Sequence, residues 1–288
     1  MVDLSAYKGN TEYDYELVMA CPVCGGKGEF EVAARHKEGS LKLIIQLYSC
    51  PNCNSSYHNP RMTEASMVKY YESGKYRTFS GRANYHPDRP AHHQRMKFFD
   101  WIPGLSPRRC LDVGCGDGFL LKLIQERFGC EIVGHDVYVD PNAHVPVITD
   151  RDKIDGKYDL IICTHVLEHL TDPLGMLDWI VSKLSDDGLV FIEVPTYKQL
   201  TIPHPIQYSK KSLPLLVQRM KLNGLILDFS ALHHPIANII ARHDPWDTDW
   251  LKDTGLFNQI PDQVIADLKP GNEDCQLNEY AWTIMPLV

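Results

Sequence analysis

The sequence lacks any long apolar run, any internal repeat and any low-complexity tract. A helix that spans a membrane needs roughly 18 consecutive apolar residues, and no stretch of this chain approaches that length. The first twenty residues mix acids and tyrosines where a signal peptide would need a basic start and an apolar centre. We therefore expect a soluble protein of the cytoplasm with no membrane partner, and we exclude collagen-like, coiled-coil and disordered chains.

Positive charge is scarce as well. The 29 Lys and Arg residues stand against 37 Asp and Glu residues, which gives a formal net charge of -8. This charge repels a phosphate backbone unless basic side chains cluster locally, so we do not expect nucleic acid as a partner. The hydrophobic content of 44% is ordinary for a globular chain, and 288 residues leave room for two folding units at roughly 150 residues each.

Cysteine occurs nine times, an odd number that favours thiols and metal binding over disulfides. Four of these residues form two Cys-Pro-x-Cys motifs, Cys21 with Cys24 and Cys50 with Cys53. The stretches between the motifs alternate apolar and polar residues around a turn at 37–40, which predicts an antiparallel hairpin. Four thiolates on a hairpin suit tetrahedral zinc, and because such a site has no open position we predict a structural Zn²⁺ ion. A disulfide pair and a thioredoxin-like redox motif are the alternatives.

Short apolar strands alternate with amphipathic helices from residue 109 onward, a pattern that predicts a parallel α/β sheet. We expect strands at 110–114, 131–136, 146–149, 159–164 and 189–194, and helices at 118–128 and 173–184. A helix at 212–222 and two strands at 225–232 and 237–243 follow, and these strands could close the sheet as an antiparallel pair. Weaker patterns predict a helix at 262–268 and a strand at 281–285.

The remaining helical pattern lies ahead of the sheet, at 62–76 and 90–101. We therefore divide the chain into four regions: a zinc ribbon at 1–60, a helical connector at 61–105, the α/β domain at 106–244 and a C-terminal extension at 245–288.

A glycine-rich turn joins the first predicted strand to its helix. Residues 111–118 read LDVGCGDG, with glycines at 114, 116 and 118. Glycine is required where a tight turn lets a ligand approach the main chain. Asp136 ends the next strand, 20 residues after Gly116, where a carboxylate can accept both hydroxyls of a ribose. A dinucleotide fingerprint would place its third glycine at Phe119, so this turn disfavours a pyrophosphate ligand.

The turn, Asp136 and the strings YDLIICTHVLEHL (158–170) and DGLVFIEVP (187–195) together resemble the class I S-adenosylmethionine-dependent methyltransferases. The resemblance implies an enzyme with a Rossmann-like seven-stranded sheet and a small N-terminal zinc-ribbon hairpin domain. It also implies S-adenosylmethionine as the cofactor, with the connector covering it. The residues that would contact the cofactor are Tyr76, Asp112, Gly114, Cys115, Gly116, Asp136, Val137, Asp150 and Thr164.

The same resemblance places the methyl acceptor at the carboxyl end of the strand at 159–164. A base is needed if the acceptor is a hydroxyl or a carbon acid, and His is the usual choice near neutral pH. We favour His165, then His169, with His204 and Tyr208 on the substrate side. A metal held by His165, Glu168 and His169, as some relatives hold one, is an alternative, and so is a purely structural capping role for the last two.

The string H-V-L-E-H also matches an inverted zinc-peptidase motif. Asp172 and Pro173 leave barely one helical turn for it, so we reject a peptidase.

The resemblance predicts methyl transfer to an oxygen or a carbon of a small molecule, such as a sugar, a nucleotide-linked sugar or a related metabolite. One alternative is a macromolecular acceptor guided by the ribbon, which would need a cationic stripe. The residues available for that stripe are Lys27, Arg35, Lys37, Lys42 and Arg61. Another is a non-catalytic zinc-stabilised binding module, which has no need for the full cofactor set. The sequence specifies neither the acceptor nor the oligomeric state.

Overall fold

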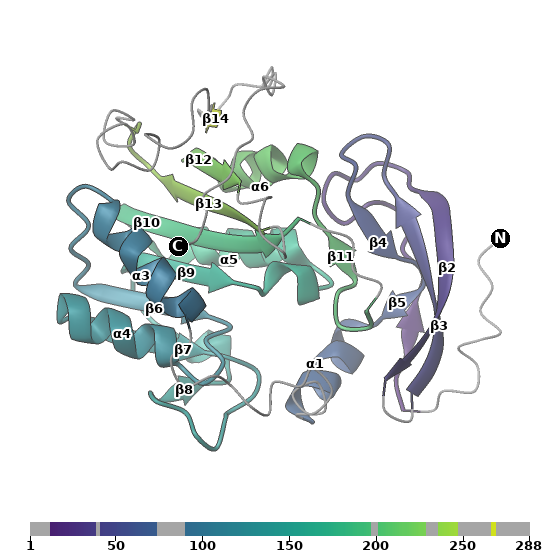
Figure 1. Ribbon diagram of the computed structural model, residues 1–288, viewed down its shortest axis with the longest axis horizontal. Coiled ribbons are helices and arrows are strands. Elements are labelled where there is room, and N and C mark those ends of the chain that lie inside the picture. Colours follow the sequence, from purple (N-terminus) through teal and green to yellow (C-terminus); the bar gives the residue numbers. More distant parts are fainter. Residues whose placement is uncertain are drawn as a thin grey trace.

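A computed structural model describes residues 12–38, 41–73, 90–196, 201–228, 236–246 and 266–268. Its largest sheet has eight strands in the order β14-β12-β13-β10-β9-β6-β7-β8 (Figure 1). The parallel part consists of β6 (Arg109–Val113), β7 (Glu131–His135), β8 (Val147–Ile148), β9 (Tyr158–Thr164) and β10 (Leu184–Pro195). Apolar residues fill these strands because helices cover both faces of the sheet.

The antiparallel part consists of β12 (Asn223–Asp228), β13 (Ile236–Arg242) and β14 (Ala266–Leu268). β13 pairs with both β10 and β12, which confirms the expected antiparallel pair and the seven-stranded sheet. β14 adds an eighth strand against β12. The helix expected at 262–268 is therefore wrong at 266–268, because pairing with the sheet edge outweighs a weak helical pattern.

Helices form a layer on each face of this sheet. α3 (Pro90–Trp101) and α4 (Phe119–Phe128) share one hydrophobic cluster with one face. α5 (Pro173–Lys183) and α6 (Leu213–Met220) share another with the opposite face (Figure 1). Pro173 starts α5, and Asp172 caps it by accepting a hydrogen bond from the Gly175 amide at 2.9 Å. No helix in the described ranges is long and apolar enough to cross a membrane.

The predicted hairpin forms the amino-terminal part of the molecule, which we call the ribbon (residues 12–62). Its strands are β1 (Tyr15–Glu16), β2 (Glu29–Glu38), β3 (Leu41–Ser49), β4 (Ser56–His58) and β5 (Arg61–Met62). α1 (Glu64–Glu72) follows, capped by Thr63. A four-stranded sheet takes the order β11-β4-β3-β2, and its outer strand β11 (Ile206–Gln207) comes from the chain that follows β10 (Figure 1).

The ribbon and the large sheet share one hydrophobic core. Cys50, Cys53 and Tyr57 of the ribbon belong to the same buried cluster as Leu167 and Ile206. The ribbon therefore packs directly against the rest of the chain.

Candidate functional site

The glycine turn at the end of β6 leaves an open space over its backbone. Gly114, Gly116 and Gly118 have φ angles of +73°, +59° and +74°, which only glycine adopts without strain. A Cβ atom at Gly114 would lie 2.2 Å from Val166, and one at Gly118 would lie 2.2 Å from Val145. No atom of the described residues lies within 4 Å of a Cβ built at Gly116. Two glycines thus serve packing, and the third lets a ligand approach the main chain.

Asp136 borders this space. Its Oδ2 atom accepts from the Gly116 amide at 2.9 Å, and its Oδ1 atom accepts from the Tyr138 amide at 3.0 Å. The side chain is only half-buried. Each carboxylate oxygen has a second lone pair, so both can still accept from the hydroxyls of a ribose.

Asp112, the last but one residue of β6, is 3% exposed, and its Oδ1 atom has no hydrogen-bond partner among the described residues. Burial raises the pKa of Asp112 to about 8; Arg95 opposes this shift and Asp136 adds to it. A buried carboxylate oxygen without a partner is costly. The ammonium group of the methionyl part of S-adenosylmethionine would supply that partner, so Asp112, Gly116 and Asp136 fit this cofactor.

A cluster of charged side chains lies at the carboxyl ends of β9 and β10. His165 has a φ of +53°, and its ring lies between two glutamates. The Nδ1 atom is 3.2 Å from Glu168 Oε1, and the Nε2 atom is 2.9 Å from Glu193 Oε1. Carboxylates can only accept, so both nitrogens donate and the ring is an imidazolium. Burial lowers the pKa of His165, but the two carboxylates outweigh it and raise the pKa to about 9.

Arg95 of α3 holds Glu193 from the other side. It donates from Nε to Oε2 at 3.2 Å and from Nη2 to Oε1. Burial works against ionisation of Glu193, yet Arg95 and His165 hold its pKa well below the usual range. Sequence reasoning missed both residues. A single acid inside the apolar strand LVFIEV was a signal for Glu193, whereas nothing in the sequence pointed to Arg95.

A second histidine, His169, lies on the other side of Glu168. Its Nδ1 atom is 2.7 Å from the Pro203 carbonyl oxygen and 2.5 Å from the Tyr71 hydroxyl. Because a carbonyl only accepts, Nδ1 carries the proton, and Nε2 lies 3.8 Å from Glu168 Oε1. The His204 ring packs edge-on against His169 with ring centres 4.6 Å apart. Burial, followed by His169, lowers the pKa of His204 to about 3, so this ring is neutral.

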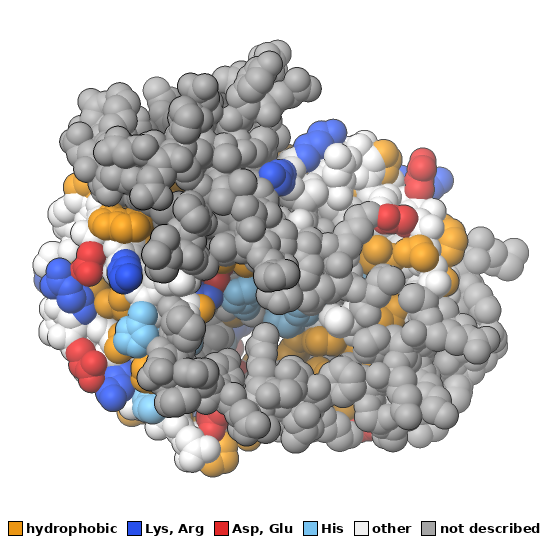
Figure 2. Space-filling model, in the orientation of Figure 1, with side chains coloured by type: hydrophobic (Ala, Val, Ile, Leu, Met, Phe, Trp, Pro, Cys, Tyr) orange, Lys and Arg blue, Asp and Glu red, His pale blue; other side chains and the backbone are white. Residues whose placement is uncertain are grey.

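Glu168, His169 and His204 bring ligand-type atoms within 4.8 Å of one another. Glu168 is 1% exposed, and its Oε2 atom has no hydrogen-bond partner among the described residues. This group could hold a divalent ion. Figure 2 shows histidine side chains in a hollow near the middle of one face of the molecule.

The comparisons with known proteins agree with this geometry. A family model described as "Methyltransferase domain" matches residues 85–238, more than half of the chain. The chain belongs to the methyltransferase domain family. The fold and the family expected from the resemblance are thereby confirmed.

Two relatives of this methyltransferase domain are both named "Ubiquinone biosynthesis O-methyltransferase". The protein of Acinetobacter baumannii is 27% identical over 124 residues, covering 36% of this chain and 52% of the relative. The protein of Erwinia tasmaniensis is 28% identical over 123 residues, covering 36% and 50%. The chain thus spans about half the length of these relatives.

A crystal structure of the Burkholderia thailandensis 1,6-didemethyltoxoflavin-N1-methyltransferase shares the fold. It superposes with a TM-score of 0.52 at 16% identity, covering 73% of this chain and 99% of that one.

The other residues expected to contact the cofactor differ in their exposure and surroundings. Cys115, Val137 and Thr164 are half-buried around the turn and the end of β9. Asp150 is exposed, and its Oδ1 atom accepts from the Asp152 amide at 3.1 Å, which caps a short 3₁₀ helix. Tyr76 lies outside the described residues.

Three expectations for the acceptor side need correction. His165 is not available as the first-choice base, because a ring already protonated near neutral pH cannot accept a proton. The alternative metal set of His165, Glu168 and His169 is not the one assembled, because His165 is held by Glu168 and Glu193 and His204 takes its place. Tyr208 is 2% exposed and donates to the Leu167 carbonyl at 3.1 Å, so it is a structural residue.

The H-V-L-E-H string does not form the helix that the peptidase motif requires. β9 ends at Thr164, and only a three-residue 3₁₀ helix, Leu167–His169, follows it. The sequence-based rejection of a peptidase is consistent with this geometry.

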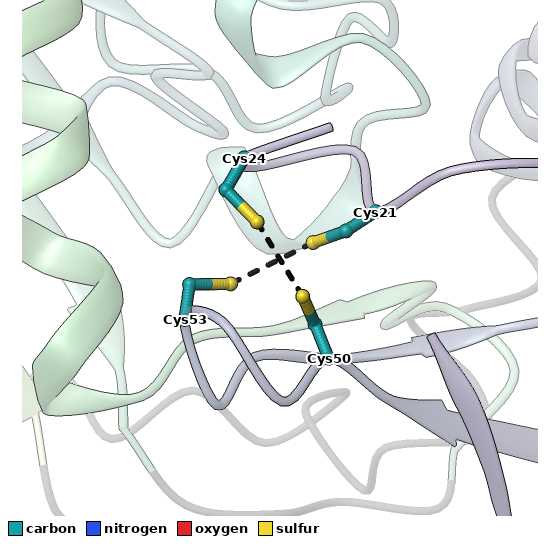
Figure 3. Close-up of side chains that lie close together, drawn as sticks. All are labelled: Cys21, Cys24, Cys50 and Cys53. Carbon is teal, nitrogen blue, oxygen red and sulfur yellow. Dashed lines mark hydrogen bonds between the residues drawn. The ribbon is translucent and has the colours of Figure 1, made fainter. Parts of the chain in front are cut away.

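The four ribbon cysteines point toward one centre (Figure 3). The Sγ atoms of Cys21 and Cys53 are 3.6 Å apart, and those of Cys24 and Cys50 are 3.4 Å apart. Zinc at about 2.3 Å from each sulfur of a tetrahedron requires S···S distances of about 3.8 Å, so the donor set fits this ion. Both motifs turn in the same way: Gly25 donates to the Cys21 carbonyl at 2.9 Å and Asn54 to the Cys50 carbonyl at 2.8 Å.

Proposed function

We propose that this methyltransferase domain protein binds S-adenosylmethionine at the glycine turn and transfers its methyl group to an oxygen or carbon of a small molecule. A sugar, a nucleotide-linked sugar or a related metabolite is the acceptor we favour. The observation that carries the proposal is the buried Oδ1 atom of Asp112, which has no hydrogen-bond partner among the described residues, on the strand that leads into the open turn at Gly116. The names of the relatives, ubiquinone biosynthesis O-methyltransferases, support a small-molecule acceptor.

The cofactor half of the site aligns the reaction. When bound, S-adenosylmethionine supplies an electrophilic methyl group on a sulfonium centre. Asp112 pairs with the ammonium group, Asp136 accepts from the ribose hydroxyls, and Gly116 lets the ligand approach the main chain. Alignment and exclusion of water are the main requirements of such a displacement.

The acceptor half supplies the base, and we assign this role to His169. The Pro203 carbonyl fixes its tautomer, so Nε2 is the atom that takes a proton from the acceptor. Glu168 lies 3.8 Å from that atom and would stabilise the imidazolium that forms. Burial raises the pKa of Glu168, but the imidazolium that forms on His169 and the hydrogen bond from His165 outweigh this effect and lower that pKa, so Glu168 is ionised.

Two metal roles belong to the proposal. The ribbon cysteines hold a structural zinc ion, with no open position for chemistry. A divalent ion at Glu168, His169 and His204 is a second way to activate the acceptor, because it would lower the pKa of a bound hydroxyl.

The test is methyl transfer from methyl-labelled S-adenosylmethionine to a panel of sugars and nucleotide-linked sugars. His169→Gln should lower kcat about 100-fold or more, the usual contribution of a positioned base, with unchanged cofactor affinity. His243→Gln, at an exposed histidine, is the matched control and should behave like the parent protein.

Other results of this test would favour the alternative functions or the metal-assisted route. Cofactor binding without transfer to any acceptor would favour the binding module. Labelling of RNA, DNA or protein alone would favour the macromolecular acceptor, although Arg61 of the cationic stripe already donates to Glu16 and to the Thr171 carbonyl. Loss of activity on chelation, restored by Mg²⁺ or Mn²⁺ with the ribbon zinc retained, would favour the metal-assisted route.

A further inference from the structure

One segment, residues 203–209, joins the ribbon to the acceptor half of the site. The Pro203 carbonyl accepts from His169 Nδ1 at 2.7 Å. Two residues later, the Pro205 carbonyl accepts from the His58 amide of the ribbon at 2.9 Å. His204 lies between these two anchors, so its position depends on both sides.

The remaining residues of this segment also contact the ribbon and the acceptor half in turn. β11 pairs with β4 of the ribbon, Ile206 opposite Tyr57 and Gln207 opposite Ser56. Tyr208 then donates to the Leu167 carbonyl at 3.1 Å, next to Glu168. Ser209 donates from Oγ to the carbonyl of Cys53 at 2.6 Å, which connects the segment to one of the four cysteines themselves.

Packing reinforces these bonds. Cys50, Cys53 and Tyr57 lie in one buried cluster with Ile206 and Leu213, and none of them is more than 2% exposed. A shift of the cysteine turn would therefore move the segment that carries His204, because close-packed interiors transmit strain.

The hydrogen bonds of the cofactor half are made within other elements, although Leu111 and Val113, which flank Asp112 on β6, belong to the same buried cluster as the cysteines. Gly114 and Cys115 donate to the His135 carbonyl, and Gly116 donates to Asp136. α4, which follows the turn, packs in the cluster that contains Phe98 and Phe99 of α3.

We propose that the four-cysteine site is a positioning element for the acceptor half of the active site, with Ser209 as the positioning residue that connects them. The metal holds the turn at Cys50–Cys53, the turn and β4 hold residues 203–209, and these residues hold His204 beside His169. This inference rests on the proposed function only for its kinetic consequence; the link itself is a property of the chain.

The kinetic test compares three variants of the full-length, metal-loaded protein. Ser209→Ala should lower kcat about tenfold, equivalent to about 1.4 kcal/mol in the barrier. The Kd for S-adenosylmethionine should stay within about twofold of the parent value, a much smaller change than that in kcat. Ser209→Thr keeps a hydroxyl and should restore most of the rate. Ser182→Ala, at an exposed position of α5, is the control, because it removes a hydroxyl-to-carbonyl hydrogen bond, to Trp179 at 2.6 Å, that lies outside the ribbon.

The second test does not use activity. Hydrogen exchange is followed in the parent protein with and without metal, in a peptide covering 203–209 and one covering α4. Metal removal should speed exchange in the first peptide and leave the second unchanged. Exchange that rises equally in both peptides, or a Ser209→Ala variant whose kcat equals that of the parent, would overturn the link. If the protein binds no S-adenosylmethionine, the proposed function fails, and the exchange experiment still decides the link.

Discussion

Four ionised side chains lie in one row at the acceptor side: Arg95, Glu193, His165 and Glu168. The row contains two cations and two anions, so each buried carboxylate has a partner that offsets its desolvation. These ion pairs also matter for His169, because they keep Glu168 ionised next to this proposed base. The left-handed backbone of His165, with a φ of +53°, is the strained position that directs the ring between the two carboxylates.

The raised pKa of His165 predicts how stability changes with pH. An unfolded histidine titrates near a pKa of roughly 6.5, and the folded one near a pKa of about 9. The folded state therefore binds more protons between these values, so this contribution is complete below about pH 6.5 and is lost as the pH rises through about 9. The free energy of unfolding, from urea titrations at several pH values, should fall across this window.

The control for this prediction is His165→Asn. Asparagine tolerates the left-handed backbone but is too short to reach both glutamates. Its free energy of unfolding should be lower than that of the parent at pH 6.5, and the difference should shrink toward pH 9.5. A difference that does not depend on pH would mean that His165 is neutral.

The residues that sequence reasoning identified are those fixed by short spacing. Asp112 and Gly116 belong to one continuous strand and turn, and Asp136 directly follows the next strand. His169 and His204 were identified singly, but their contact depends on how residues 203–209 fold back against β4. The Arg95–Glu193 pair joins α3 to β10, and no local pattern encodes a pair so distant in the chain.

At the scale of elements, the three glycines of the turn have two roles: Gly114 and Gly118 allow close packing, and Gly116 allows a ligand to approach the main chain.

The expected strands and helices agree with the structure to within a few residues where the apolar pattern is regular. β11 was not predicted because two residues carry no periodicity, and its pairing with β4 is decided by tertiary contact.

Two alanine variants separate these roles of the turn. Gly114→Ala must adopt a left-handed backbone and also displace Val166, so the free energy of unfolding should fall by about 3 kcal/mol. In Gly116→Ala the new Cβ meets no atom of the described residues within 4 Å, so only the backbone penalty of about 1 to 2 kcal/mol applies. Its Cβ atom enters the open space, however, and the affinity for S-adenosylmethionine should fall more than tenfold.

Urea titrations and calorimetric titrations of both variants check this prediction. If Gly116→Ala binds the cofactor as tightly as the parent protein, no ligand approaches the turn at that point. If Gly114→Ala is as stable as Gly116→Ala, the contact with Val166 relaxes freely.

At the scale of the whole molecule, the described parts of the ribbon and the large sheet form one packed body. The buried cluster that contains the cysteines continues into the sheet, and β11 completes the ribbon sheet from the opposite side. Sequence reasoning separated the two because their patterns differ, and it had no means to show that they share a core. Among the described residues, the proposed cofactor half belongs to the large sheet and its loops, and the proposed acceptor half lies where the two parts meet.

The most direct test of this account is calorimetric titration of the full chain with S-adenosylmethionine at pH 7, in two buffers of different ionisation enthalpy. Because the pKa of Asp112 is about 8 in the unliganded protein, binding of the ammonium group should be saturable and should release protons, which makes the heat depend on the buffer. Asp112→Asn should bind more weakly without that dependence, and Asp178→Asn, an exposed control on α5, should match the parent protein. The absence of saturable binding, or equal affinity in Asp112→Asn, would contradict the account.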